Sequence, residues 1–168
     1  MVIDAQMISN FIKEFGDDSN DLTILINEIT LKIGIVLDDI IEQEWRNTAG
    51  NQIFEIWFSQ CIAENQIKYI ERSIVEIQYL KKLVTKYGFP KKKSRDIHYI
   101  KCANCTDVRY ILTDDIDFYD PKHKESSYKV KEMIKTNRNG QLNNYLRRKL
   151  RIIVGRIEHC RNDFSCLT

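Results

Sequence analysis

A short apolar segment that ends in a cluster of carboxylates constrains this chain more than any other feature. Val108 to Leu112 has the composition of a buried strand, and it is followed by Thr113, Asp114, Asp115 and Asp117. Ionised carboxylates are costly to remove from water without a partner, and neighbouring carboxylates repel one another. Their position at the end of a strand therefore indicates either a bound cation or a catalytic site.

Short apolar segments alternate with amphipathic helical segments over the first two thirds of the chain. Strands are expected at residues 2–3, 35–37, 67–70 and 108–112. Apolar spacing predicts helices at 5–15, from 22 to the glycine at 34, and at 40–46, 53–62, 74–87 and 96–105. This alternation predicts an α/β fold with a parallel sheet, whose ligand crevice lies at the carboxyl ends of the strands. Asp4 and Asp115 both follow such ends.

The pattern changes beyond residue 120. Residues 121–168 are rich in lysine and arginine, and helical segments there carry an apolar stripe of Leu142, Tyr145, Leu146, Leu150, Ile153 and Ile157. We therefore expect a core at residues 1–120 and a basic helical C-terminal extension at 121–168 that packs on it. The stripe is compatible with core packing, with a homodimer interface or with a groove for a protein partner.

Charge is distributed unevenly along the chain. The overall formal charge is only +2, but residues 1–60 carry −8, residues 61–120 carry +2 and residues 121–168 carry +8. A basic segment attached to an acidic one is expected of a metal-loaded site beside a phosphate-binding surface, although solvated charged helices give the same pattern.

Composition favours a soluble, cytoplasmic protein. The 168 residues are 43% hydrophobic and 30% charged, as in a globular domain, and no apolar run is long enough to span a bilayer. Five cysteines are an odd number, which favours free thiols in a reducing compartment. Cys102 and Cys105 have half of a zinc-knuckle spacing that His159, Cys160 and Cys166 could complete, but buried cysteines are the main interpretation.

Four carboxylates are placed where the expected topology brings them together. Asp4 ends the first strand, Glu44 lies one to two turns into the helix after the second strand, Asp96 opens a helix, and Asp115 follows Thr113. Such oxygen ligands suit one or two Mg²⁺ or Mn²⁺ ions, which activate water and neutralise charge on a phosphate. Two alternatives stay open: Asp4 and Asp96 could be helix N-caps, and Glu42 rivals Glu44.

The same residues resemble the PIN domain. The resemblance is carried by Val-Ile-Asp4, by Glu44, by Asp96 with Ala103 seven residues later, and by the motif from Thr113 to Phe118, and it covers about residues 1–120. It implies a three-layer fold with a short central parallel sheet flanked by helices. It also implies a Mg²⁺- or Mn²⁺-dependent endoribonuclease, a group that includes many bacterial toxins with antitoxin partners.

On that match Asp4, Glu44, Asp96 and Asp115 are the catalytic metal ligands, Thr113 supports them, and Asp117 is an additional or outer-sphere ligand. Ala5 and Gln6 depart from the family, which commonly has a small hydroxyl residue and asparagine there. This departure motivates a second interpretation, a catalytically inactive scaffold that binds nucleic acid or protein. A third is an all-helical interaction protein.

Two basic clusters are the expected contacts to phosphates. They comprise Lys91, Lys92, Lys93 and Arg95 before the aspartate at 96, and Arg147 and Arg148 in the C-terminal segment. The expected substrate is RNA, with single-stranded DNA as the other option, and no membrane partner is expected. The sequence leaves the number of metal ions open.

Overall fold

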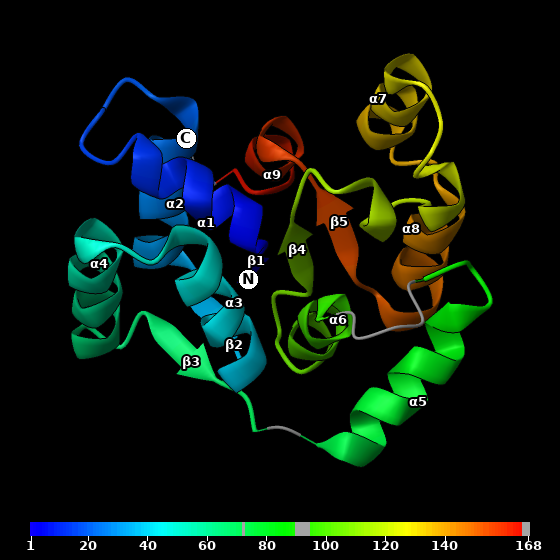
Figure 1. Cartoon of the computed structure of the whole chain (residues 1–168), viewed down its shortest axis with the longest axis horizontal. Helices are drawn as coiled ribbons and strands as arrows, with labels where there is room; N and C mark the ends of the chain where they lie inside the picture. The colour runs from blue at the N-terminus through cyan, green and yellow to red at the C-terminus, as the bar shows by residue number, and fades with distance from the viewer. Residues whose placement is uncertain (72, 90–94, 166–168) are drawn as a thin grey trace.

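The computed structural model describes residues 1–71, 73–89 and 95–165, and it is a mixed α/β structure (Figure 1). Its strands are β1 (Val2–Ile3), β2 (Ile35–Leu37), β3 (Ile67–Tyr69), β4 (Tyr110–Leu112) and β5 (Ile153–Gly155). Its α-helices are α1 (Ala5–Lys13), α2 (Asp21–Lys32), α3 (Asp39–Ala49), α4 (Gln52–Ala63), α5 (Ile74–Thr85), α6 (Asp96–Asn104), α7 (Tyr128–Asn137), α8 (Gln141–Tyr145) and α9 (Ile157–Asp163). Two 3₁₀ turns, η1 (Ile116–Phe118) and η2 (Pro121–His123), follow β4, and a π-helical turn, η3 (Leu146–Leu150), continues α8.

Polar side chains at the predicted turns start several helices. The Asn20 Oδ1 accepts hydrogen bonds from the backbone N–H groups of Leu22 and Thr23, so Asn20 is the N-cap of α2. Gly34 follows α2 with a φ of +81°, a left-handed conformation that favours glycine. The chain can therefore leave the helix and enter β2 at once.

All the strand pairs are parallel, which confirms the predicted α/β class. β1 pairs with β4, β4 pairs with β5, and β2 pairs with β3. The strands thus form a three-stranded sheet, β1-β4-β5, and a two-stranded sheet, β2-β3. Met1 joins the two sheets, because its backbone N donates to the Gly34 carbonyl at 3.0 Å and its carbonyl accepts from the Val36 N–H at 2.8 Å. The strands therefore lie in the order β3-β2-β1-β4-β5.

This strand order places a topological switch between β1 and β4. The chain builds outward from β1 to β2 and β3, then crosses through α5 and α6 and builds outward on the other side as β4 and β5. The crossover leaves a crevice beyond the carboxyl ends of β1 and β4, where ligands commonly bind in open parallel sheets. Asp4 follows β1 at this crevice, and Thr113 follows β4.

Helices cover the short strands and close the core. α6 packs against β1, β2 and β4, α1 packs against α2 and α3, and α2 contacts α9. Trp45 of α3 is fully buried, and its Nε1 donates to the Ile3 carbonyl at 3.2 Å, while Trp57 of α4 packs beside it. Both tryptophans are thus core residues. No helix within the described ranges is long and apolar enough to cross a membrane.

The C-terminal segment differs from its prediction as purely helical. Arg151 adopts a left-handed φ of +57°, which ends η3, and Ile153 to Gly155 then form β5 at the edge of the sheet. Ile153 therefore belongs to a strand, and the expected helical stripe is broken. The parallel sheet also makes the all-helical interpretation wrong. The boundary at residue 120 stays a prediction, although the residues after it contribute to the same sheet.

Candidate functional site

Asp4 and Asp115 are linked through Thr113 at the switch between β1 and β4. The Thr113 hydroxyl donates to Asp4 Oδ2 and accepts from the Asp115 N–H at 3.0 Å. Asp4 Oδ1 accepts from the Gln6 N–H at 3.0 Å, so Asp4 is also the N-cap of α1. The cap and the site position are therefore compatible, because each uses a different carboxylate oxygen.

The surroundings of Asp4 disfavour its charge. The pKa of Asp4 is raised from 3.8 to about 6, mainly by burial and in smaller part by the negative charges of Asp115 and Asp96. The hydrogen bonds from Thr113 and Gln6 act in the opposite direction and offset only part of this effect. A crowded carboxylate with a raised pKa is typical of a site that receives a cation or a proton.

Glu44 faces the same cluster. Burial raises the pKa of Glu44, and the charges of Asp96 and Asp4 add to the effect. The Tyr99 hydroxyl donates to Glu44 Oε2 at 3.3 Å and accepts from the Ala5 N–H at 3.2 Å. Tyr99 thus satisfies a second N–H at the start of α1, next to the one that Asp4 caps, and it contacts Glu44 at the same time.

Glu42 points elsewhere. Its carboxylate accepts from Arg46 Nε at 2.7 Å and from the Tyr69 hydroxyl at 2.5 Å, in an ion pair on the surface formed by α3 and β3. Because the electrostatic neighbours of Glu44 are Asp96 and Asp4, the structure favours Glu44 over Glu42 as the acidic site residue of α3.

Asp96 begins α6, and its charge acts on both Asp4 and Glu44. The N-cap of α6 is Arg95, which makes no side-chain capping hydrogen bond, so the N-cap interpretation of Asp96 is wrong. Arg95 is half-buried and its positive charge acts on Glu44. This arginine is therefore placed beside the carboxylates.

A buried polar network fixes α6 to the end of β2. Asp38 is fully buried, and its Oδ2 lies 2.6 Å from His98 Nδ1 and 3.6 Å from Lys101 Nζ. Burial alone raises the pKa of Asp38, but the hydrogen bond with His98 and the charge of Lys101 outweigh it, and the pKa is lowered. His98 and Lys101 are not among the predicted site residues. The i and i+3 spacing of His98 and Lys101 was the available signal.

Asp115 and Asp117 occupy the turn after β4. Burial raises the pKa of Asp115, whose Oδ1 accepts from the Asp117 N–H at 2.9 Å. The Asp117 side chain is buried, with Oδ2 at 2.5 Å from Lys124 Nζ. Asp117 Oδ1 has no hydrogen-bond partner among the described residues. Lys124, which the sequence analysis missed, is exposed, and its charge also acts on Asp115 and Asp96.

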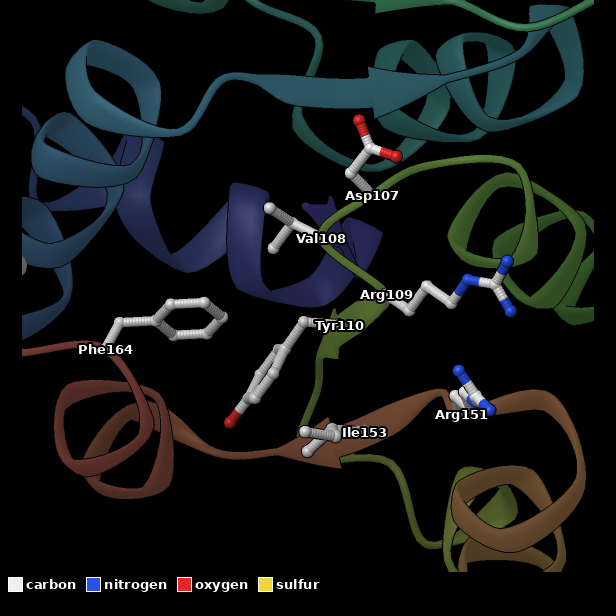
Figure 2. A pocket seen from close by; sticks show the side chains of 7 residues that line it. All are labelled: Asp107, Val108, Arg109, Tyr110, Arg151, Ile153 and Phe164. Carbon is white, nitrogen blue, oxygen red and sulfur yellow. The ribbon is translucent and has the colours of Figure 1, made fainter.

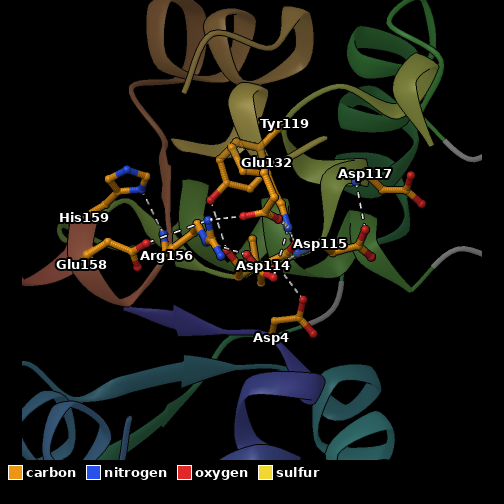
Figure 3. A network of polar contacts seen from close by, with 11 residues as sticks. Asp4, Asp114, Asp115, Asp117, Tyr119, Glu132, Arg156, Glu158 and His159 are labelled. Atoms are coloured by element: carbon orange, nitrogen blue, oxygen red, sulfur yellow. Dashed lines mark hydrogen bonds and ion pairs between the residues drawn. The ribbon is translucent and has the colours of Figure 1, made fainter. Parts of the chain in front are cut away.

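Asp114 belongs to a separate ion-pair network (Figure 3). Its carboxylate lies 3.1 Å from Lys135 Nζ and 2.6 Å from Arg156 Nε, and Glu132 pairs with both cations at 2.7 and 2.9 Å. Arg156 follows β5, so the network ties α7 and the end of β5 to the end of β4. Asp114 therefore neutralises basic residues of the C-terminal segment, and Asp115 faces the acidic cluster.

Two pockets lie at opposite ends of the strands. One of about 350 Å³ is lined at the carboxyl ends by Asp4, Gln6, Met7, Asn10, Asp114 and Asp115. A larger one of about 570 Å³ lies at the amino ends of β4 and β5, lined by Asp107, Val108, Arg109, Tyr110, Arg151, Ile153 and Phe164 (Figure 2). Asp4 and Asp115 line the smaller pocket, but Glu44 and Asp96 do not. The larger pocket is lined by a single carboxylate and two arginines.

The carboxylates do not form a ready-made chelate. In the parts of the chain that the structure describes, no three His, Cys, Asp or Glu side chains lie close enough together to hold a metal ion. Their oxygen chemistry nevertheless suits Mg²⁺ or Mn²⁺, and Mg²⁺ usually keeps several waters and takes only one or two carboxylates directly. Asp4 and Asp115, which are joined through Thr113, could supply these one or two carboxylates.

The predicted phosphate contacts are spread over different places. Lys91, Lys92 and Lys93 lie outside the described residues. Arg147 is exposed and donates to Asn144 Oδ1 at 3.1 Å. Arg148 is exposed beside Tyr145 and lines a further pocket. Of the described arginines in the predicted clusters, only Arg95 lies beside the acidic cluster.

Comparison with known proteins finds no counterpart: no family model, no curated protein and no solved structure matches this chain. The function is therefore inferred from the residues and geometry of the acidic site.

Thr113→Val tests the link between the two strand ends. Valine has nearly the same shape but cannot donate to Asp4 or accept from the Asp115 N–H, so we expect the variant to lose about 1–3 kcal/mol of unfolding free energy, measured with urea. Thr113→Ser keeps the hydroxyl and is the control, with a much smaller loss expected. Equal stability of the valine variant and the wild type would show that the link is not structural.

The raised pKa values predict an unusual dependence of stability on pH. A carboxyl whose pKa is raised by folding binds its proton more tightly in the folded state, so Asp4 stabilises the fold less as pH rises from about 4 through about 6. Asp115→Asn removes one repelling charge and keeps the Oδ1 acceptor for Asp117. Without metal, we expect the free energy of unfolding of Asp115→Asn, relative to that of the wild type, to increase by about 1 kcal/mol as the pH rises from about 4.5 to about 7.5.

The matched control for this measurement is Asp114→Asn. Asp114 pairs with Lys135 and Arg156, so its loss should destabilise the protein at pH 7.5, in the opposite direction to Asp115→Asn. If both variants were destabilised alike in urea titrations, the proposed repulsion between Asp115 and Asp4 would be contradicted.

Proposed function

We propose that this protein is a PIN-like, Mg²⁺- or Mn²⁺-dependent endonuclease that hydrolyses RNA phosphodiester bonds. The observation that carries the proposal is the pair of carboxylates, Asp4 and Asp115, joined through Thr113 at the switch between β1 and β4. Glu44 and Asp96 act on Asp4 electrostatically from two further helices. The proposal is supported because the Asp4–Asp115 pair lies at the kind of crevice where a parallel sheet commonly binds its ligand, within electrostatic reach of two further acidic residues.

The chemistry of the donors supports one or two divalent ions held by Asp4, Asp115, Glu44 and Asp96, with Asp117 as an outer partner. When bound, such ions supply an activated water at neutral pH and offset negative charge on the scissile phosphate. The raised pKa values of Asp4, Glu44 and Asp115 are consistent with this role, because a cation relieves the repulsion that raises them.

The remaining residues of the site position the acidic groups and attract the substrate. Thr113 holds Asp4 in place, and Tyr99 orients Glu44 against the start of α1. Lys124 is anchored by Asp117 at the margin of the cluster, where its exposed ammonium group can contact a phosphate oxygen. Without such a cation, the carboxylates would repel the phosphates of RNA before any reaction.

A second candidate is a PIN-like scaffold that binds nucleic acid or protein without cleavage, since the residues that the structure describes contain no preformed chelate. Ala5 is consistent with this alternative, since it offers no hydroxyl beside Asp4. A role as a growth-inhibiting toxin or a defence nuclease, together with an antitoxin partner or a homodimer, remains a prediction from the resemblance.

Cleavage of labelled total RNA and single-stranded DNA tests the proposal. Purified protein is incubated with Mn²⁺, Mg²⁺ or EDTA, and we expect RNA cutting only with a metal. Asp115→Asn and Glu44→Gln should each lower the rate by at least about 100-fold, since even partners of metal ligands typically contribute 10–100-fold. Both substitutions keep the shape of the side chain, so circular dichroism should be unchanged.

Glu42→Gln is the matched control on the same helix. Glu42 pairs with Arg46 and Tyr69 away from the acidic cluster, so its substitution should leave the cleavage rate within about threefold of the wild type. A folded wild type that cuts neither substrate would favour the scaffold. Cutting that survives in Asp115→Asn would place the reaction elsewhere.

A further inference from the structure

Two tyrosines, one just after α5 and one at the end of α8, form an aromatic pair. The ring centroids of Tyr87 and Tyr145 lie 4.7 Å apart, with an angle of 38° between the ring planes. The Lys86 ammonium lies over both rings, 4.9 Å from the first centroid and 5.0 Å from the second. Both tyrosines are half-buried, so each presents part of its surface to solvent.

The pair lines a pocket of about 360 Å³ with basic residues at its side. The other lining residues are Gln141, Asn144, Arg148 and Lys149. Arg148 and Lys149 are exposed, and within the described residues neither takes part in an ion pair. Lys124, Lys135 and Arg156, by contrast, each pair with a carboxylate. The pocket therefore combines aromatic faces with cations that have no internal partner.

The segment that contains Lys122 and Lys124 connects this pocket with the acidic residues. Gln141 accepts a hydrogen bond from Lys122 Nζ at 3.2 Å, and Lys122 stands two residues before Lys124. Lys124 pairs with Asp117, whose N–H donates to Asp115 Oδ1. Exposed lysines thus lie along the surface between the aromatic pair and the proposed site of cleavage.

We propose that the pocket formed by Tyr87, Tyr145, Arg148 and Lys149 binds single-stranded nucleic acid. A base stacks on the tyrosine rings, and the neighbouring phosphates contact Arg148 and Lys149. Lys86 is exposed and lies at the rings in a cation–π contact, which a base can replace while the ammonium moves to a phosphate. Because paired bases are already stacked on one another, the pocket selects unpaired strands.

This inference deepens the nuclease proposal by defining where the substrate continues beyond the acidic cluster. It is tested by binding alone, in EDTA, so that cleavage plays no part. A fluorescently labelled mixed-sequence 12-nucleotide RNA, and a DNA strand of the same sequence, are titrated with wild type, Tyr145→Ala, Tyr145→Phe and Arg148→Gln in anisotropy measurements.

We expect Tyr145→Ala to weaken binding of the single strands by about tenfold, the effect of losing one stacked base. Tyr145→Phe retains the ring and should bind as the wild type does. Arg148→Gln should flatten the dependence of log K on log salt by about 0.7, the loss of one phosphate contact with a single strand. A difference between the RNA and DNA arms would identify the sugar that the pocket accepts.

Tyr128→Ala and Lys129→Gln are matched controls, since both residues are exposed on α7 outside this pocket, and their binding should be unchanged. Binding of duplex RNA or polyglutamate as tight as that of the single strand would overturn the proposal, as would wild-type affinity in both Tyr145→Ala and Arg148→Gln. So would a wild type that binds no single strand. If the wild type binds the single strand but shows no metal-dependent cleavage, the nuclease proposal is contradicted and the binding proposal is not. Asp115→Asn should bind the strand whether or not the wild type cleaves it.

Discussion

The parallel pairing of β1 with β4 is the constraint on which the acidic site depends. The last backbone contact of that pair runs from the Asp4 N–H to the Leu112 carbonyl at 3.0 Å, and it sets Asp4 beside Thr113. The hydroxyl of Thr113 then connects residues that are more than a hundred positions apart in sequence. Because the connections from these two parallel strands run to opposite sides of the sheet, a crevice is left beyond their carboxyl ends, where Asp4 and Asp115 line a pocket.

The negative charge of the acidic residues is only partly offset by the basic residues around them. The carboxylates of the cluster raise one another's pKa, which costs folding free energy unless a cation is present. Basic residues of the C-terminal segment lie around the cluster without cancelling it, since Arg156 and Lys135 are occupied by Asp114 and Glu132. Buried Asp38 holds α6 in place through His98, so the acidic start of that helix keeps its position.

Most strands and helices could be predicted from local sequence patterns, whereas the remaining features depend on tertiary contacts. The strand ends at Asp4 and Asp115 could be predicted because short apolar segments precede them. The choice between Glu42 and Glu44 could not, because both lie within one helical turn and only the positions of Tyr69 and Tyr99 separate them. β5 was missed because its isoleucine at 153 fits helical spacing, and no sequence signal marked the left-handed residue at 151.

Calorimetric titration of Mn²⁺ into the metal-free protein is the most direct test of the central claim that the carboxylates joined through Thr113 form a divalent-metal site. The wild type should bind one or two ions at pH 7.5, and Asp115→Asn, equally well folded, should bind at least one ion fewer or bind much more weakly. A folded wild type that binds no Mn²⁺, or identical binding by both proteins, would contradict the claim.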